Sequence, residues 1–278
     1  MTLTRPDFEF VCTVVRQRSG IVLEVDKDYL IENRLSTLAR KEGLASVPQL
    51  VERVRGEPHG TLTAKLIEAM TTNETSFYRD VAPFDALRLN VLPELLARNA
   101  QTRRLTVWCG ASSTGQEPYS LAILLREHFP QLATWDVSVT ATDLSTVVLE
   151  QAKKGTYSQL EVNRGMPASL LAKYFRRVGA AWQVTDDVRS LVSFRPLNLL
   201  EPLPPMPAAD LVMLRNVLIY FDVPTKKGIL AKVRKVLKPG GYLFLGGAET
   251  TMGIDPAFER VTFGKASAYR HTAAVASG

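Results

Sequence analysis

The stretch from Leu105 to Ser120 constrains the fold more than any other part of this sequence. In its first residues, Leu105, Val107 and Trp108 are apolar and β-prone and predict a short buried strand. Small residues follow from Gly110 to Gly115, and a helix with Pro118 in its first turn comes next. A strand, a loop of small residues and a helix N-terminus together bring backbone N–H groups within reach of a ligand. Many α/β domains contain such a turn, so this stretch alone does not identify a binding site.

Two acidic residues narrow the range of ligands that this stretch could bind. Glu117 lies at the start of the predicted helix, and Asp143 closes the next predicted strand, Val137 to Thr142. In Rossmann-like nucleotide sites an acid at this second position binds ribose hydroxyls. The third glycine of the dinucleotide fingerprint is missing, and no basic residues form a phosphate cradle. These features indicate a nucleoside ligand without phosphates, so S-adenosylmethionine fits better than NAD or ATP.

Composition limits the class of protein. The 278 residues are 46% hydrophobic and 22% charged, which is typical of a soluble globular protein. No apolar run approaches the roughly 20 residues that span a bilayer, and the start, MTLTRPDFEF, has no apolar signal region. We therefore expect a cytoplasmic protein without membrane insertion. Two isolated cysteines, Cys12 and Cys109, and three histidines indicate neither a disulfide framework nor a metal site.

The chain carries a basic excess. Its formal charge is +6 and its pI is about 9.3, which is compatible with an acidic partner. An ordinary solvated surface explains the same numbers equally well. Nucleic-acid binding stays open at this point, although no basic strand studded with aromatic residues is visible.

The first part of the chain predicts a helical domain, residues 1–80, followed by a linking helix within 81–104. Amphipathic patterns predict four helices in the first segment, over 6–19, 28–42, from 48 to 54 and 61–70. In the second of these, Arg34 and Lys41 lie seven residues apart and share a face, with Arg40 beside it. Basic residues on helices are most often simply solvated, so they identify no partner by themselves.

The remaining residues, 105–278, predict an α/β domain with a small antiparallel β insert at about 172–196. Three β-like pieces form this insert, at 174–178, 182–185 and 191–195. The parallel pattern then resumes with a buried strand over 210–214, a helix over 225–237, a turn at 237–241 and strands over 242–246, 260–263 and 268–271. Ligands of such folds bind at the carboxyl ends of strands, which places Asn216 and Tyr220 at the functional edge.

Four motifs in this order resemble the CheR-type chemotaxis receptor methyltransferases: MTTNETSFYRD (70–80), WCGASSTGQEPYSLA (108–122), ATDLS (141–145) and LRNVLIYFD (214–222). The resemblance covers nearly the whole chain. It implies a Rossmann-like S-adenosylmethionine-dependent methyltransferase fold preceded by an all-α domain. It also implies methyl transfer from S-adenosylmethionine to receptor glutamates, with S-adenosylhomocysteine as the product and no metal.

The resemblance also implies roles for single residues. Arg79 and Tyr220 would lie at the transfer site. The cofactor would be bound by Asn73, Thr75, Arg79, Glu117, Asp143, Asn198, Leu199, Arg215 and Asn216. Arg34, Arg40 and Lys41 would meet the acidic helical surface of the chemoreceptor cytoplasmic domain. We expect a monomer that does not bind nucleic acid.

Two positions depart from the family pattern. Ser112 occupies a loop position that usually holds cysteine, a small change. The insert between Phe175 and Phe194 is short, and its turn is only Val178 to Ala181, which resembles members that do not require a receptor pentapeptide. Two alternatives remain: a methyltransferase that acts on RNA or another acidic substrate, and a cofactor-binding adaptor without activity. An adaptor would not need to keep Arg79, Asn216 and Tyr220 together.

Overall fold

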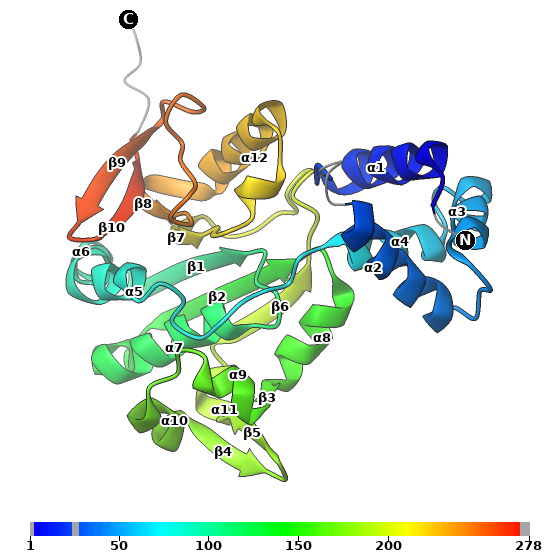
Figure 1. Cartoon of the computed structure of the whole chain (residues 1–278). Helices are drawn as coiled ribbons and strands as arrows, with labels where there is room; N and C mark the ends of the chain where they lie inside the picture. The colour runs from blue at the N-terminus through cyan, green and yellow to red at the C-terminus, as the bar shows by residue number, and fades with distance from the viewer. Residues whose placement is uncertain (1–2, 24–27, 273–278) are drawn as a thin grey trace, which may run out of the picture.

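The computed structural model describes residues 3–23 and 28–272, which form a helical domain beside an α/β domain (Figure 1). The helical domain consists of α1 (Arg5–Ser19), α2 (Asp28–Lys41), α3 (Val47–Gly56) and α4 (Thr61–Met70). Thr4 and Ser46 cap α1 and α3 by accepting hydrogen bonds from the backbone N–H groups of the first turn. Buried aliphatic side chains, among them Leu35, Leu50 and Leu66, hold the four helices together. These helices agree with the predicted ones to within one or two residues at each end.

The linking helix departs from its predicted regularity. The sequence predicts one regular helix within 81–104, whereas the structure has α5 (Ala82–Ala86), a π-helical turn η2 (Leu87–Val91) and α6 (Leu92–Arg98). Pro93 has no N–H to donate into the helix, and the N–H of Leu92 instead donates to the carbonyl of Leu87. The π turn accommodates this proline without breaking the helix.

Among the described residues, the main sheet has seven strands in the order β6-β2-β1-β7-β8-β10-β9. Strands β1, β2, β6, β7 and β8 run parallel, and β10 runs antiparallel to both β8 and β9. The strands are β1 (Arg104–Gly110), β2 (Asp136–Asp143), β6 (Val192–Pro196), β7 (Ala209–Met213), β8 (Leu237–Phe244), β9 (Phe258–Phe263) and β10 (Ala266–His271). Because the chain order reverses at β1, the carboxyl end of this strand is the topological switch point where ligands bind in such sheets.

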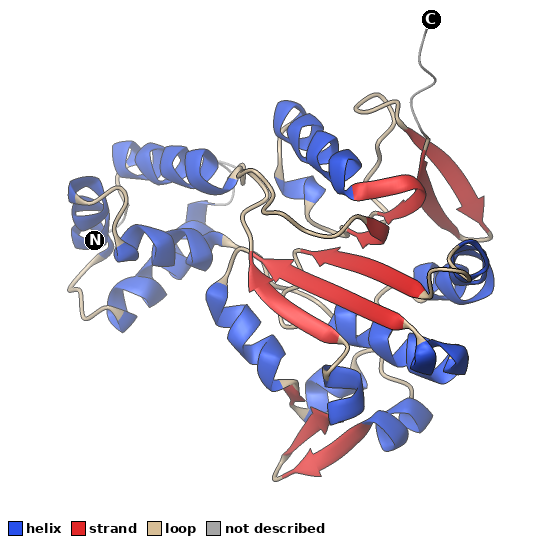
Figure 2. Ribbon diagram, turned by 180° about the vertical axis from the view of Figure 1, so that it is seen from behind, coloured by secondary structure: helices blue, strands red, loops and turns tan. Residues whose placement is uncertain are grey.

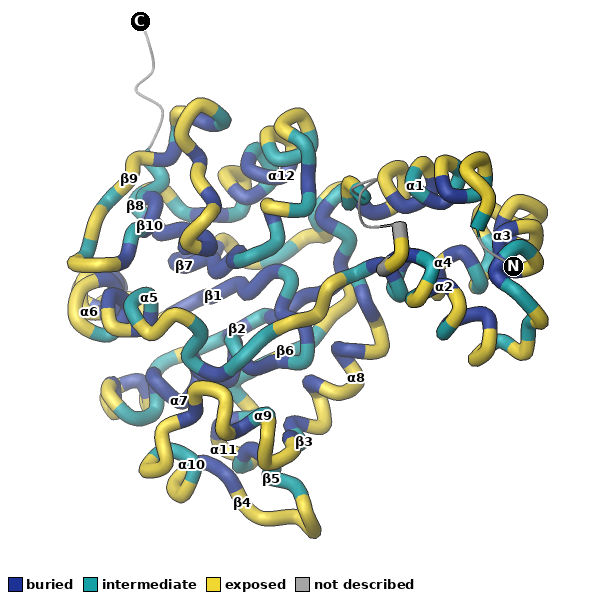
Figure 3. The backbone as a smooth tube through the Cα atoms, viewed as in Figure 1, coloured by how far each residue is buried: buried dark blue, intermediate teal, exposed yellow. Residues whose placement is uncertain are grey.

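Helices cover both faces of the sheet (Figure 2). On β1, Leu105, Val107 and Cys109 pack with α6 and α7 (Gln116–His128) on one face. Trp108 points to the other face, where α12 (Val223–Val236) packs. Strands β1 and β7 are buried almost throughout, as Figure 3 shows, and this double burial explains their nearly continuous apolar sequence.

The insert lies between α8 (Thr146–Lys154) and β6. It contains a three-stranded antiparallel sheet in the order β3-β5-β4, made of β3 (Thr156–Tyr157), β4 (Phe175–Val178) and β5 (Ala181–Val184). Three short helices accompany it: α9 (Gln159–Asn163), α10 (Ala168–Tyr174) and α11 (Asp186–Arg189). The prediction that 191–195 belongs to this insert is wrong, because these residues enter β6, the edge of the main sheet, paired parallel to β2. The hydrophobic pattern of such a short, half-exposed edge strand does not indicate which strand it pairs with.

A second correction concerns the turn predicted at 237–241. In the structure these residues are the beginning of β8, which pairs with β7 through a register shift between Ala209 and Leu211. Pro239 and two glycines normally indicate a turn, but here they form an irregular strand start, with Gly240 at a φ of 72°.

The two domains meet near the end of α1. Ile21 forms an isolated antiparallel bridge with Phe221, and the N–H of Val22 donates to the carbonyl of Tyr220 at 2.9 Å. An ion pair of 2.6 Å joins Arg16 to Asp222. None of the helices in the described parts of the chain has the length and hydropathy that a bilayer crossing requires.

Candidate functional site

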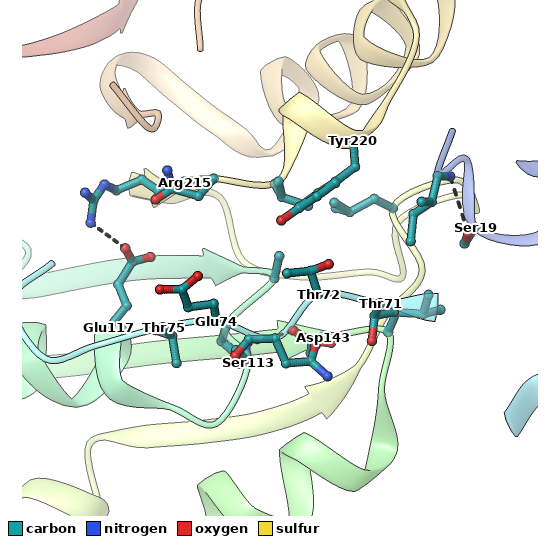
Figure 4. Close-up of a pocket in the computed structure, with 18 of the residues that line it drawn as sticks. Ser19, Thr71, Thr72, Glu74, Thr75, Ser113, Glu117, Asp143, Arg215 and Tyr220 are labelled. Carbon is teal, nitrogen blue, oxygen red and sulfur yellow. Dashed lines mark hydrogen bonds and ion pairs between the residues drawn. The ribbon is translucent and has the colours of Figure 1, made fainter. Parts of the chain in front are cut away.

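A pocket lies at the carboxyl edge of the sheet, between the two domains (Figure 4). The loops that follow β1, β2, β6 and β7 form its floor and sides, and residues 71–75, Arg79 and the end of α1 complete it. The empty space between its walls, which includes open solvent, is about 910 Å³. The structure brings all ten sequence-predicted cofactor and catalytic residues to this one pocket: Asn73, Thr75, Arg79, Glu117, Asp143, Asn198, Leu199, Arg215, Asn216 and Tyr220.

Asp143 ends β2 at the floor of the pocket. One carboxylate oxygen accepts from the N–H of Ser113 at 2.8 Å, and the other accepts from the N–H of Ser145 at 2.9 Å. The residue is only 7% exposed. Burial raises the pKa of this carboxyl group, and the backbone N–H groups oppose the rise. Each oxygen can accept a further hydrogen bond, so the carboxylate can still bind a ligand hydroxyl.

The small-residue loop after β1 has strained backbone. Ala111 and Ser113 have φ values of 52° and 49°, in the left-handed region. The Ser113 hydroxyl donates to the carbonyl of Asn73 at 2.8 Å, which ties the loop to the segment that precedes the α/β domain. The hydroxyl of Ser112 is buried and has no hydrogen-bond partner among the residues that the structure describes. This hydroxyl lies on the pocket wall, so it can form a hydrogen bond with a polar group of a bound ligand.

Glu117 lies in the first turn of α7 and pairs with Arg215, whose Nη1 is 2.8 Å from its carboxylate. The side chain of Glu117 is 13% exposed and that of Arg215 only 1%. Burial raises the pKa of Glu117, whereas the guanidinium of Arg215, and less strongly that of Arg79, lowers it. Arg215 also donates to the Asp80 carboxylate at 2.7 Å and to the carbonyl of Arg79 at 3.1 Å. Figure 4 shows its guanidinium turned toward Glu117, so Arg215 holds Glu117 in place.

Arg79 and Tyr220 come from different parts of the chain. Arg79 belongs to the segment that enters the α/β domain, and its Nη1 donates to the carbonyl of Glu74 at 3.1 Å. Tyr220 lies in the short 3-10 helix η4 (Leu218–Tyr220) after β7, and its hydroxyl points into the pocket (Figure 4). The pocket thus has a cation and a phenol on its wall, a pair that can hold a carboxylate.

Glu249 shapes the loop after β7, and the sequence reasoning missed it. Its carboxylate accepts from the backbone N–H groups of Asn216, Ile219 and Gly246 at 2.8, 3.2 and 2.6 Å. Asn216 has a φ of 58°, so the loop needs this support to hold its conformation. The only signal in the sequence is an acid shortly after the Gly-Gly pair that ends a strand. Asp80, which pairs with Arg215, was missed for the same reason, since both act through tertiary contacts.

Asn198 and Leu199 form the wall near the helical domain. The Asn198 side chain donates to the carbonyl of Arg18 at 2.7 Å and accepts from the N–H of Leu200 at 3.0 Å, so its amide joins the domains. Apolar residues provide the rest of this wall: Leu144, Leu197, Leu199, Val217 and Phe221. Apolar walls beside carboxylates suit a ligand that combines an adenine ring, ribose hydroxyls and a positive charge. Among the described residues, no group of three or more His, Cys, Asp or Glu side chains could hold a metal ion.

The three basic residues of α2 have different surroundings. Arg40 and Lys41 are exposed. Arg34 and Lys41 border one shallow hollow, as their spacing predicts, whereas Arg40 borders another. The guanidinium of Arg34 is half-buried and donates to the carbonyls of Met70 and Thr71 at 2.8 and 3.2 Å. Arg34 therefore makes an internal contact that the sequence did not predict.

Comparison with known proteins agrees with this geometry. Residues 6–71 match the family model "CheR methyltransferase, all-alpha domain", and residues 73–266 match "CheR methyltransferase, SAM binding domain". Chemotaxis protein methyltransferase Cher2 of Pseudomonas putida is 40% identical over 260 residues, which cover 92% of this chain and 94% of that protein. Chemotaxis protein methyltransferase 1 of Pseudomonas aeruginosa is 40% identical over 275 residues, or 97% and 99% of the two chains. The chemotaxis protein methyltransferase of Vibrio parahaemolyticus is 38% identical over 265 residues, or 94% and 95%. The chain therefore belongs to the CheR methyltransferase family, and it is an S-adenosylmethionine-dependent methyltransferase.

Proposed function

We propose that this protein transfers the methyl group of S-adenosylmethionine to glutamate side chains in the cytoplasmic helices of chemoreceptors, giving methyl esters. The relatives named above are chemotaxis protein methyltransferases, which supports a chemoreceptor substrate. The observation that carries the proposal is the presence of Arg79 and Tyr220 on the wall of the cofactor pocket. Together they provide the donors that a substrate carboxylate requires at the point of transfer.

The reaction requires the protein mainly to position the reacting groups and to exclude water from them. When bound, S-adenosylmethionine supplies a methyl group already activated on a sulfonium. A glutamate side chain has an ordinary pKa of about 4.3, so it is ionised at neutral pH and needs no general base. Arg79 and Tyr220 would orient this carboxylate for in-line attack, and such positioning is worth roughly 7–11 kcal/mol. Ser19 and Ile21 of the helical domain line the same pocket and help to exclude water.

The remaining wall residues would bind the cofactor. Asp143 would accept hydrogen bonds from the ribose hydroxyls, as an acid at the end of the second strand does in related folds. Glu117 would bind another polar group of the cofactor, in a position that Arg215 fixes. Asn73, Thr75, Asn198, Leu199 and Asn216 would complete the contacts, all from loops that border the pocket.

The receptor would approach the basic face of α2. Arg40 and Lys41 are exposed there, and the acidic surface of a receptor helix complements them. The β4–β5 turn consists only of Gly179 and Ala180, too short to provide an additional loop for a tethering pentapeptide. We infer that the protein acts as a monomer in the cytoplasm and binds receptor helices directly, without a pentapeptide tether.

The test is methyl transfer from labelled S-adenosylmethionine to a chemoreceptor cytoplasmic fragment, followed by mild alkali. Release of the label as volatile methanol supports the proposal, because carboxyl methyl esters hydrolyse under these conditions. Alkali-stable label would move the chemistry to nitrogen or to a nucleic acid. Bound cofactor without any transfer, over a panel of receptor fragments, would instead favour a non-catalytic adaptor.

A further inference from the structure

Arg34 contacts the segment that joins the two domains. Its Nη1 donates to the carbonyls of Met70 at 2.8 Å and Thr71 at 3.2 Å, and its Nη2 donates to the hydroxyl of Thr72 at 3.2 Å. Met70 is the last residue of α4, so these carbonyls lie at the negative end of a helix. The last turn of α4 has no basic residue of its own, and Arg34 supplies this charge from α2.

The same segment forms one wall of the cofactor pocket. Residues 71–75 all line it, and Figure 1 shows this segment, in cyan, passing from α4 over the sheet edge. The α/β domain also holds the segment, because Ser113 donates to the carbonyl of Asn73 and Arg164 forms an ion pair of 2.9 Å with the carboxylate of Glu74. The wall is therefore held on one side by the α/β domain and on the other by Arg34.

We infer that Arg34 is a positioning residue for the cofactor, acting through the segment from Met70 to Thr75. The inference rests on the proposed roles of Asn73 and Thr75 in cofactor binding. Without Arg34, the first residues of the segment lose three hydrogen bonds from one guanidinium. The segment then has more conformational freedom in the free protein. Cofactor binding must remove this freedom at a cost in free energy, so the affinity for the cofactor falls. A role limited to receptor binding would leave the cofactor affinity unchanged.

Lys41 provides a matched control. It lies on the same helix and borders the same hollow as Arg34, but its side chain is exposed. Either substitution removes one positive charge from this face, but among the contacts of the described residues only Arg34 of the two donates to the segment. The experiment measures S-adenosylhomocysteine binding by calorimetry, with the full chain and without any receptor, for the wild type, Arg34→Gln, Arg34→Lys and Lys41→Gln.

For Arg34→Gln we expect the Kd of S-adenosylhomocysteine to rise by about tenfold, which is about 1.4 kcal/mol. For Arg34→Lys we expect a smaller rise, because an ammonium group can still meet the helix end but does not span three acceptors. Lys41→Gln should bind like the wild type. The stoichiometry of each titration reports the folded fraction, so an unfolded sample is not mistaken for weak binding.

Wild-type affinity in Arg34→Gln, together with reduced receptor methylation, would overturn the inference and leave Arg34 as a receptor contact only. Where Arg34→Gln does not fold, Arg34→Lys takes its place: we expect a measurable rise in Kd, and wild-type affinity in that variant would overturn the inference. The assay contains no receptor and no methyl transfer. Its outcome is therefore independent of the alkali test, and failure of the proposed reaction would be recognised separately.

Discussion

Replacement of Arg215 by leucine would leave the carboxylate of Glu117 without its cation in a nearly dry site. The pair is 2.8 Å long, and the two side chains are 1% and 13% exposed. Removing one partner of a buried ion pair destabilises a protein by about 3–5 kcal/mol, chiefly because the other charge stays buried. Arg104 and Asp136 form a matched control at 2.9 Å, with side chains 62% and 65% exposed, and Arg104→Leu should lose at most about 1 kcal/mol.

The loss in Arg215→Leu should depend on pH. Burial already raises the pKa of Glu117, and without Arg215 the pKa rises further. A carboxyl group with a raised pKa in the folded state favours folding when protonated, and this contribution disappears as the pH rises through that pKa. The variant should therefore be least stable at pH 8 and approach the wild type as the pH falls toward the ordinary pKa of Glu, about 4.3.

The measurement is urea unfolding followed by tryptophan fluorescence. All three tryptophans, Trp108, Trp135 and Trp182, lie in the α/β domain, so the signal reports this domain rather than the helical one. The double variant with Glu117→Leu should recover much of the loss, because no charge is then buried without a partner. A loss of the same size at every pH, or one that the double variant does not relieve, would refute the reasoning.

Four further outcomes follow from single contacts. Asp143→Asn should weaken S-adenosylhomocysteine binding by about tenfold or more in calorimetry, because a charged acceptor for the ribose hydroxyls is lost; unchanged affinity would exclude this role. Tyr220→Phe should lower kcat by about tenfold and leave cofactor affinity intact, whereas a collapse of affinity would make Tyr220 a binding residue. Lys41→Glu should slow receptor methylation, and the effect should shrink as salt is added; an effect independent of salt would argue against an electrostatic contact. Gly165→Ala should destabilise the protein by several kcal/mol in urea unfolding, because its Cβ would lie 2.0 Å from the carbonyl oxygen of Phe77. Gly179 also has a positive φ but lies in open space, so Gly179→Ala should destabilise the protein by only about 1 kcal/mol.

Much of the fold is predictable because periodicity and caps are local. Helix α4 was predicted with its observed bounds, and β1, β2 and β7 were recognised from their buried apolar runs. The failures occurred where the partner of a segment decides its structure. Residues 191–195 join the main sheet through β2, and the glycines before Tyr242 extend β8 because β7 lies beside them. Neither partner is visible in the segment itself.

The candidate site likewise contains residues that the sequence predicts and residues whose contacts it does not reveal. Asp143 and Asn216 line the pocket at the sheet edge, where the sequence predicts them because the carboxyl ends of parallel strands meet there, and their roles toward the cofactor stay predictions. The resemblance between motifs added Arg79 and the role of Tyr220 at the transfer site. Glu249 was missed because it acts on backbone N–H groups of a loop thirty residues away. The internal bonds of Arg34 were missed because a basic residue on a helix looks the same in the sequence whether it faces water or another segment.

The position of Arg34 has a thermodynamic consequence for the receptor. Its guanidinium supports the cofactor wall and also borders the hollow shared with Lys41, on the face where we place the receptor. If an acidic receptor side chain binds in this hollow, the guanidinium is shared between the receptor and the segment from Met70 to Thr75. Receptor binding then changes cofactor affinity, and linkage requires that the cofactor change receptor affinity by the same factor. Arg34→Gln should abolish this mutual effect, whereas Lys41→Gln should weaken receptor binding and leave the linkage in place.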